Sequence, residues 1–449
     1  MITAAGRLLT RVDRAADGLA ADLALYAVSA AFALVTAAFS TLLPHRGWGA
    51  VAAWVYVGAA LVVSVQLVAR RIGGRRPPWH SPSTARAERS PLTASATWPR
   101  WTALAGRAPL TWVVWIGAAL VPLVVEAVQR AGGRTDRAQE EVLVVEQMGH
   151  RLLESGTPYL GRDAIAALPA GERLLGYAPY QPGMAVFGLP RAAAGDAWWT
   201  DARVWFAVVT AAALITGIAL VRHADHAARV RALQFATVLP ICALTLATGG
   251  DDLPVLALCL LALACCATGR FGAGGIAIGV AAACKLFALP VLVVLGVLAV
   301  VAGRGHRLLP AALGLPLLAL LPALLVDADA LVENALRFPL GHGVVTSPAQ
   351  SPFPGHLIAA AVPGGRYVAA ALLAAVAVAI AVLLVRHPPR TAGAAALFCG
   401  WGLLAAILLM PTTRFGYLLY PLALLAWAPV LGKYSATSAP RHDGALYRV

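Results

Sequence analysis

Residues 366–385 read RYVAAALLAAVAVAIAVLLV, and no charged side chain follows Arg366 within this stretch. A helix of about 20 such residues is long enough to cross the hydrocarbon core of a bilayer. Lipid offers the backbone no hydrogen-bond partner, so a spanning segment must be a helix or part of a closed β-barrel. Barrel strands alternate apolar and polar residues, and this stretch does not. It therefore predicts a transmembrane helix.

The whole chain repeats this pattern. Of its 449 residues, 60% are hydrophobic and 12% are charged, whereas a soluble domain carries about 25% charged residues. The six cysteines all lie inside apolar runs and are interpreted as packing residues. Hydropathy predicts an all-α, polytopic membrane protein with about 12 spans. These are residues 24–43, 50–70, 109–128, 203–221, 232–248, 252–268, 272–287, 289–303, 308–326, 366–385, 393–410 and 416–431.

Basic residues are distributed unevenly over the two sides of this topology. With the N-terminus in the cytoplasm, the cytoplasmic segments hold 22 of the 35 Lys and Arg residues but only 6 of the 21 Asp and Glu residues. Cytoplasmic loops of membrane proteins carry such an excess of Lys and Arg. We therefore expect a multi-pass plasma-membrane protein with both termini in the cytoplasm. The net charge of +14 then requires no nucleic acid as a partner.

The topology divides the chain into four parts. Residues 1–70 are expected to form an N-terminal transmembrane hairpin. Residues 71–108, rich in Arg, Ser and Pro, are expected to be a disordered cytoplasmic linker. Residues 109–432 form the main transmembrane domain, which includes a long outer loop at 130–202, and residues 433–449 form a cytoplasmic tail.

The outer loop opens with GGRTDRAQEEVLVVEQMGHRLLESGTPYL at residues 132–160. Apolar residues recur there at helical spacing, which predicts an amphipathic helix lying on the membrane and ending at Gly156. A solvated helix face and capping of the helix start explain most simply its acidic residues, Asp136, Glu140, Glu141 and Glu146.

Two further features place charge next to apolar spans. The outer turn ATGGDDLP carries Asp251 and Asp252 at the start of the next span. Helix capping explains this pair, and binding of a divalent cation or a sugar hydroxyl is the functional alternative. Lys285 lies between apolar stretches, where a charge costs several kcal/mol unless it reaches water or an anion. A lipid phosphate is its natural partner, and snorkelling to the interface is the alternative.

Cationic and aromatic residues occur on the same predicted side. Arg suits bidentate recognition of a phosphate, and His can neutralise a leaving phosphate or donate to it. With Lys285, the cationic residues of the late outer segments indicate a site for an anionic lipid: Arg337, His342, His356 and Arg414. The aromatic residues are expected to line a substrate groove, although interfacial anchoring explains them too: Tyr177, Tyr180 and Tyr417.

Three motifs resemble the polyprenol-phosphate-sugar-dependent membrane glycosyltransferases of family 87, a group that contains bacterial α-1,2-mannosyltransferases. They are an acidic residue opening a helix that runs into LLESGTPYL, the turn and helix GGDDLPVLALCLLALA, and AGGIAIGVAAACKLFALPVL. The likeness covers roughly residues 110–430. It implies a GT-C-like fold with loop helices on the outer face, in which residues 109–432 are the catalytic domain.

The resemblance also implies a reaction. A sugar, mannose or a similar pentose or hexose, would pass from a polyprenyl-phosphate donor to an envelope lipid or glycan acceptor at the outer face of the plasma membrane. Glu141 would take the proton of the acceptor hydroxyl. Because the base of the family is usually Asp, Asp136 and Glu140 remain alternatives.

The resemblance assigns the donor phosphate to the cationic residues, Lys285, Arg337 and Arg414 together with His342 and His356. The resemblance implies a reaction without a metal or other cofactor, although Asp251 and Asp252 leave a divalent cation open. The turn departs from the amide-bearing turn of the family, so the resemblance supports the reaction class better than the identity of the sugar.

A membrane transporter or lipid flippase is the main alternative function, and a noncatalytic membrane scaffold is the second. Transporters often contain internal repeats and place ionisable residues deep in several spans. The sequence shows no internal repeat, and its charges gather at one face. Both observations favour the glycosyltransferase.

Overall fold

The computed structural model describes residues 18–73 and 106–432, and in these ranges the chain forms helices joined by turns and loops. An isolated bridge between Gln350 and Thr413 is the strand-like pairing present in these ranges. The all-α prediction is therefore confirmed for the described residues. Most of the predicted linker and the predicted tail (433–449) lie outside them.

Seven helical segments in the described ranges are long and apolar enough to cross a membrane. Ala- and Leu-rich sequence favours these helices locally. The seven are α2 (Leu19–Phe39), α3 (Leu43–Gly73), the continuous run of α5 (Arg107–Trp115), η2 (Ile116–Leu120) and α6 (Val121–Ala131), α11 (Ala202–Leu220), α17 (Gly305–Val332) with η5 (Glu333–Arg337), α19 (Gly365–Arg386) and α20 (Ala392–Leu409).

The other predicted spans also coincide with helices, but these are bent or short. Helices α12 (His226–Ala236) and α13 (Pro240–Thr248) meet at an angle of 44° and count as an eighth span if they cross together. The remaining apolar helices have 10–17 residues, a length typical of buried core helices. They are α14 (Asp252–Ala267), α15 (Phe271–Cys284), α16 (Ala288–Val301), and η6 (Phe415–Leu418) with α21 (Leu419–Leu431). The count of about twelve crossings stays a prediction.

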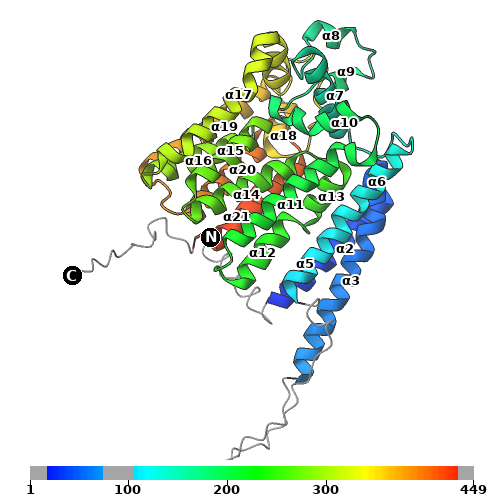
Figure 1. Ribbon diagram of the computed structural model, residues 1–449, viewed down its shortest axis with the longest axis vertical. Coiled ribbons are helices and arrows are strands. Elements are labelled where there is room, and N and C mark those ends of the chain that lie inside the picture. Colours follow the sequence, from blue (N-terminus) through cyan, green and yellow to red (C-terminus); the bar gives the residue numbers. More distant parts are fainter. Residues whose placement is uncertain (1–17, 74–105, 433–449) are drawn as a thin grey trace, which may run out of the picture.

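Short helices gather at one end of the bundle of long helices (Figure 1). Most belong to the predicted outer loop, and α18 belongs to a second loop between α17 and α19. They are α7 (Glu140–Ser155), α8 (Arg162–Ala167), α9 (Arg173–Gly176), η3 (Pro182–Gly188), α10 (Leu189–Ala194), η4 (Trp198–Thr200) and α18 (Pro354–Ala361).

Helix α7 confirms the predicted amphipathic helix, and it ends at Gly156 with φ +77°. Its apolar face, however, packs inside the protein. Met148 is fully buried, and Gly149 lies so close to the backbone of Gly188 that a Cβ would meet its carbonyl carbon at 2.3 Å. The expectation that α7 lies on the membrane by this face is therefore wrong, because η3 and α10 cover it.

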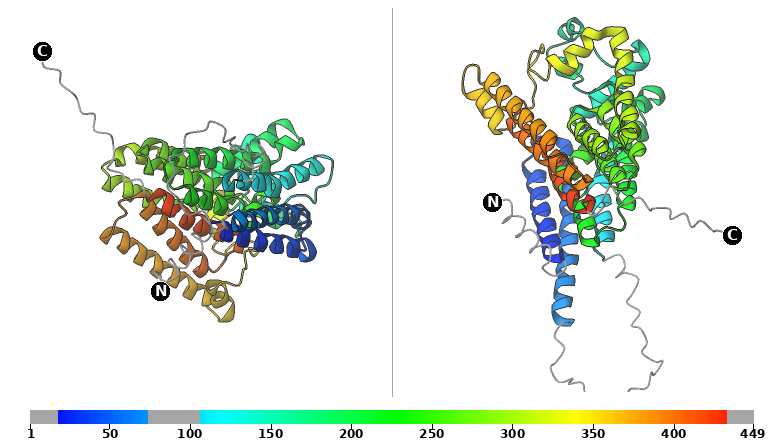
Figure 2. Two further views of the ribbon diagram at one scale, coloured as in Figure 1. Left: turned by 90° about the horizontal axis from the view of Figure 1, so that it is seen from below. Right: turned by 90° about the vertical axis from the view of Figure 1, so that its left-hand side faces the viewer.

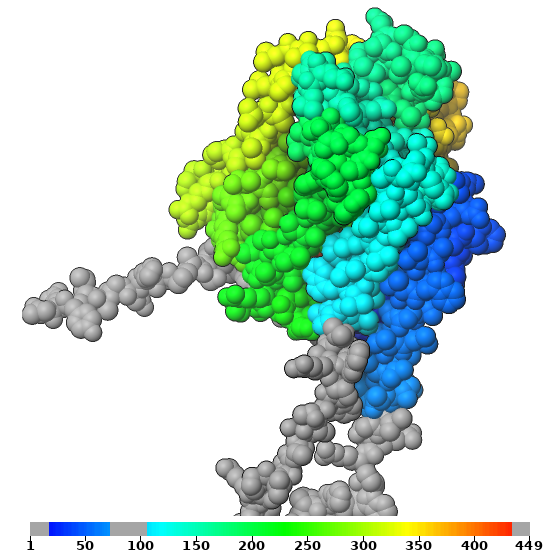
Figure 3. All heavy atoms as spheres, turned by 45° about the vertical axis from the view of Figure 1, so that its right-hand side comes forward, coloured from blue at the N-terminus to red at the C-terminus, as the bar shows by residue number. Residues whose placement is uncertain are grey.

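The N-terminal hairpin of α2 and α3 runs beside the α5–α6 helix on one face of the molecule (Figure 3). Buried hydrogen bonds attach it: Trp48 Nε1 donates to the Ala118 carbonyl at 2.7 Å, and Tyr56 Oη donates to the Val238 carbonyl at 2.6 Å. On another side, α19 and α20 diverge towards the loop end from the helices of the central part of the chain (Figure 2). A cavity lies at this end.

Candidate active site

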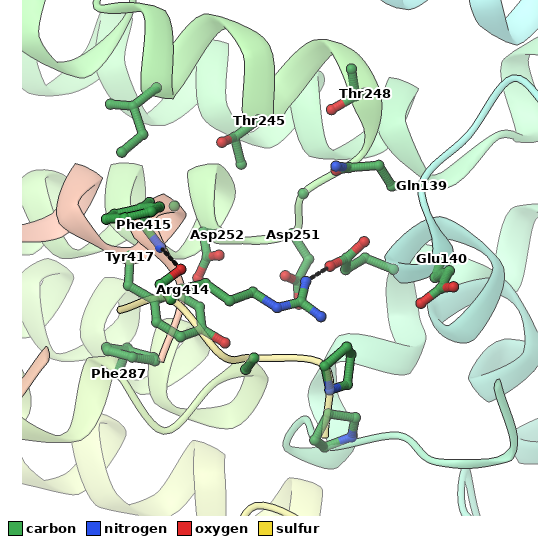
Figure 4. Close-up of a pocket in the computed structure, with 18 of the residues that line it drawn as sticks. Gln139, Glu140, Thr245, Thr248, Asp251, Asp252, Phe287, Arg414, Phe415 and Tyr417 are labelled. Carbon is green, nitrogen blue, oxygen red and sulfur yellow. Dashed lines mark hydrogen bonds and ion pairs between the residues drawn. The ribbon is translucent and has the colours of Figure 1, made fainter. Parts of the chain in front are cut away.

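A cavity of about 890 Å³ lies at the loop end of the bundle. The start of α7, the α13–α14 turn, the α15–α16 turn and η6 contribute its polar wall (Figure 4). Nine of the site residues chosen from the sequence line it: Glu140, Glu141, Tyr177, Tyr180, Asp251, Asp252, Lys285, Arg414 and Tyr417. Positions far apart in the chain thus contribute to the same cavity.

Lys285 and the acidic pair form a compact charged cluster. The Lys285 Nζ atom lies 2.7 Å from Asp251 Oδ1 and 2.6 Å from Asp252 Oδ1. Asp252 Oδ1 also accepts a hydrogen bond from Tyr420 Oη at 2.9 Å. The side chains of Lys285, Asp251 and Asp252 are 8%, 2% and 9% exposed. The ammonium group therefore occupies the place between the carboxylates where a bound cation would lie.

The low exposure of this cluster changes its titration. Burial raises the pKa of Asp251 to about 6, even though Lys285 acts in the opposite direction. Asp251 Oδ2 is buried and has no hydrogen-bond partner among the described residues. Asp251 thus has an oxygen free for a substrate or a proton.

A second ion pair joins the first loop to the end of the chain. Glu141, in the first turn of α7, accepts a hydrogen bond from Arg414 Nη1 (Figure 4). Burial lowers the pKa of Arg414, but the charge of Glu141 outweighs it and raises that pKa. The side chain of Arg414 remains 39% exposed, against 16% for Glu141. Arg414 is therefore the accessible cation of the cavity.

Backbone contacts hold the segments that carry these acids. The Gln139 amide donates to the Thr248 carbonyl at 3.0 Å, which joins the start of α7 to the end of α13. The next residue, Gly249, has φ +114°, and a Cβ there would meet a methyl group of Val142 at 2.0 Å. Only glycine tolerates this combination of conformation and crowding. The turn therefore brings Asp251 close to the first turn of α7.

Aromatic rings border the charged cluster. The Lys285 ammonium lies 5.3 Å from the ring centroid of Tyr180 and 5.8 Å from that of Tyr417. Phe287, just after Lys285, stacks on Tyr420 with centroids 5.2 Å apart. Apolar and aromatic walls around a few charged groups are typical of ligand sites.

Four other predicted site residues do not line the cavity. Asp136 lies near the exposed side chain of Arg134 and the largely buried side chain of Arg137. Arg337 lies 3.6 Å from Glu333, which belongs to the same helical turn. The carbonyl of His342 accepts a bond from Arg162, and His356 Nδ1 lies 3.1 Å from the Pro411 carbonyl. Their assigned roles stay predictions without a contact to the cavity.

Beside the cavity lies a buried ionic network that the sequence did not predict. Arg130 binds Glu146 Oε2 at 2.5 Å, and Arg203 binds Asp201 at 2.8 Å and Glu126 at 3.0 Å. Burial raises the pKa of Asp201, but the two arginines outweigh it and hold that pKa at about 2. The interpretation of Glu146 as a solvated residue is wrong, because Glu146 is buried and paired with Arg130 and Arg191. The sequence signal that could have revealed this network is that its charged residues lie at the ends of apolar spans.

Arg203 connects this network to the cavity. Its Nη1 atom donates to the Arg137 carbonyl at 2.7 Å, three residues before α7 begins. Its aliphatic carbons lie next to Gly249. One fully buried arginine side chain thus contacts both segments that carry cavity acids.

The charges of the cavity define what it can bind. Four carboxylates line it, from Glu140, Glu141, Asp251 and Asp252, together with the two permanent cations Lys285 and Arg414. Carboxylates accept hydrogen bonds from hydroxyl groups, and an exposed arginine suits a phosphate. Within the described ranges, no group of three or more His, Cys, Asp or Glu residues is arranged to hold a metal ion. The site suits a hydroxyl-rich molecule that carries one anionic group.

Comparison with known proteins agrees with this chemistry. The family model described as glycosyltransferase family 87 matches residues 177–411, more than half of the chain. The matched part includes Asp251, Asp252 and Lys285 but neither Glu141 nor Arg414. No curated protein and no solved structure matches the chain. The chain belongs to glycosyltransferase family 87 and is a membrane glycosyltransferase.

Proposed function

We propose that this glycosyltransferase transfers a sugar, mannose or a similar hexose or pentose, from a polyprenyl-phosphate donor to an envelope lipid or glycan. The reaction takes place at the outer face of the plasma membrane, and both termini are cytoplasmic. One observation carries the proposal: a carboxylate and an accessible cation, Glu141 and Arg414, face the same cavity beside a buried acidic cluster. Family membership supports the transferase over the transporter or flippase.

The donor phosphate binds at Arg414, with Lys285 deeper in the same wall. As the bond between the anomeric carbon and the phosphate oxygen breaks, negative charge grows on the leaving polyprenyl phosphate, and Arg414 stabilises it. Arg337, His342 and His356, which were assigned to the phosphate from the sequence, lie outside the cavity lining, so Arg414 takes the main role.

Glu141 is the general base. A phosphate that engages Arg414 weakens its ion pair with Glu141, and the freed carboxylate accepts the proton of the acceptor hydroxyl. The hydroxyl oxygen then bonds to the anomeric carbon from the side opposite the leaving phosphate. The sugar hydroxyls donate to Asp251 and Asp252, and the rings of Tyr180 and Tyr417 flank the sugar. The Lys285 ammonium balances the acidic pair, so the reaction uses no metal or other cofactor.

The test is sugar transfer by purified protein in nanodiscs, with a panel of polyprenyl-phosphate hexoses and pentoses and membrane lipid extracts as acceptors. Glu141→Gln keeps the size of the side chain but removes its basicity. We expect kcat to fall by about 10²–10⁴-fold while donor binding persists. Glu154→Gln, on an exposed position of the same helix, is the matched control. Full activity of Glu141→Gln, with loss in Glu140→Gln or Asp136→Asn, would reassign the base.

A further inference from the structure

The N-terminal hairpin contributes side chains to the cavity. Val28 and Phe32 of α2 line it, together with His45 in the first turn of α3. None of the three takes part in the reaction proposed above. Of the three, His45 alone is polar, and its side chain is half-buried. This imidazole is therefore the polar group that the hairpin brings to the site.

His45 contacts the residue at which α7 begins. The side-chain Nε2 atom of Gln139 is paired with Nε2 of His45, and the imidazole is the acceptor, because an amide nitrogen can only donate. Gln139 occupies the N-cap position of α7, but its side chain makes no capping bond to that helix. It therefore joins α3 to the start of α7 instead.

His45 is itself held in place by the packing of α3. Three residues further along, Trp48 Nε1 donates to the Ala118 carbonyl of η2 at 2.7 Å. Gly49 lies so close to α2 that a Cβ there would meet the Ala33 carbonyl oxygen at 2.6 Å. The end of α3 that carries His45 is thus fixed to both α2 and η2. A hydrogen bond from such a helix restrains its partner.

This restraint acts two residues before the proposed base. The Gln139 backbone amide donates to the Thr248 carbonyl, and its side chain donates to His45. Glu141 adds a third attachment, its ion pair with Arg414. In the proposed reaction a phosphate engages Arg414 and weakens that ion pair. The position of Glu141 during proton transfer then depends on the two attachments of Gln139.

We propose that His45 is a positioning residue: through Gln139 it holds the Glu141 carboxylate in place while Arg414 binds the donor phosphate. The inference rests on the proposed function and gives the N-terminal hairpin a role in the reaction. His45 and Gln139 both precede the residues matched by the family model. A displacement of about 1 Å in a catalytic group can cost about 10²-fold in rate, so a lost restraint at this place is measurable.

The test is steady-state sugar transfer by the full chain in nanodiscs. His45→Ala misplaces the base but leaves Arg414 in place, so we expect kcat to fall at least about tenfold while KM for the donor stays within about twofold. His45→Gln restores an acceptor for the Gln139 amide and should recover most of the rate. His150→Ala is the matched control, because His150 is exposed on α7 and does not line the cavity.

A double variant separates this contact from general loosening. If His45 acts through Gln139, the variant His45→Ala/Gln139→Ala should lose no more than about twofold in kcat beyond either single variant. The proposal is refuted if kcat of His45→Ala is unchanged, if His45→Gln fails to recover the rate, or if the two single losses multiply. Should His45→Ala fail to fold, His45→Asn replaces it, because the shorter amide does not reach Gln139.

Hydrogen exchange keeps the inference distinguishable from the proposed function. Backbone amides of residues 140–148 should exchange at least about threefold faster in His45→Ala than in the unaltered protein, and equal rates would overturn the restraint. Faster exchange without transfer from any polyprenyl-phosphate sugar would refute the proposed function and leave the restraint standing. Normal transfer with unchanged kcat in His45→Ala would do the reverse.

Discussion

Replacing Lys285 with Met tests whether the buried cluster depends on its ammonium group. The cluster has one positive and two negative charges, all less than a tenth exposed. Lys285→Met leaves two adjacent carboxylates unpaired in a site that water hardly screens. Breaking a buried pair in this way costs about 3–5 kcal/mol. Asp251→Asn instead leaves one cation and one anion, so we expect a cost of about 1 kcal/mol or less.

The measurement is the free energy of unfolding in mixed micelles, followed by the loss of helical circular dichroism during titration with a denaturing detergent. The double variant Lys285→Met/Asp251→Asn retains a single buried carboxylate, Asp252, which still accepts from Tyr420. We therefore expect it to be more stable than Lys285→Met alone. The reasoning is refuted if Lys285→Met lowers the free energy of unfolding no more than Asp251→Asn does. It is also refuted if the change in the double variant equals the sum of the two single changes.

Three other substitutions test the supports of the site. Gly249→Ala forces a Cβ into a contact of 2.0 Å at φ +114°, so we expect a loss of about 1–3 kcal/mol. Gly171→Ala, which has open space, should change stability little in the same unfolding assay. The pKa of Asp251 lies near the ordinary aspartate value of 3.8 in the unfolded chain but at about 6 in the folded protein. Protonated Asp251 therefore contributes roughly 3 kcal/mol to the free energy of unfolding below pH 4, and this contribution is lost as the pH rises to 6. Between pH 4 and pH 6 the free energy of unfolding should depend less on pH in Asp251→Asn than in the unaltered protein. An identical pH dependence would contradict the raised pKa of Asp251. Arg203→Met leaves buried carboxylates unpaired and should cost about 3–5 kcal/mol, whereas a loss below about 1 kcal/mol would show that the network is not ionised.

Local properties of the sequence determined the membrane character and the helices. Hydropathy depends on runs of about 20 residues, and each predicted apolar run coincides with a helix or a bent pair. The helix that carries Glu141 and its end at Gly156 followed from periodicity and a glycine. Residue chemistry also singled out Lys285 and the Asp251–Asp252 pair, because charges beside apolar spans need a partner.

The partners of these charges were beyond the reach of local patterns. Glu141 and Arg414 are 273 positions apart, and their meeting depends on how helices from both ends of the chain pack. Placing residues on one side of a membrane does not place them in one cavity. For this reason Arg337 and His356, which share the predicted side, contact other partners, and His342 does not line the cavity.

By itself, the sequence determined a helical membrane protein with acids and bases beside its spans. The tertiary structure alone decided which of them meet, that Glu146 is buried in an ionic network, and that α2 lines the cavity. The physical reason is the separation along the chain of the residues that determine each property. Helix formation and partition into lipid are set by neighbouring residues, whereas an ion pair or a cavity wall depends on the angles at which distant helices pack.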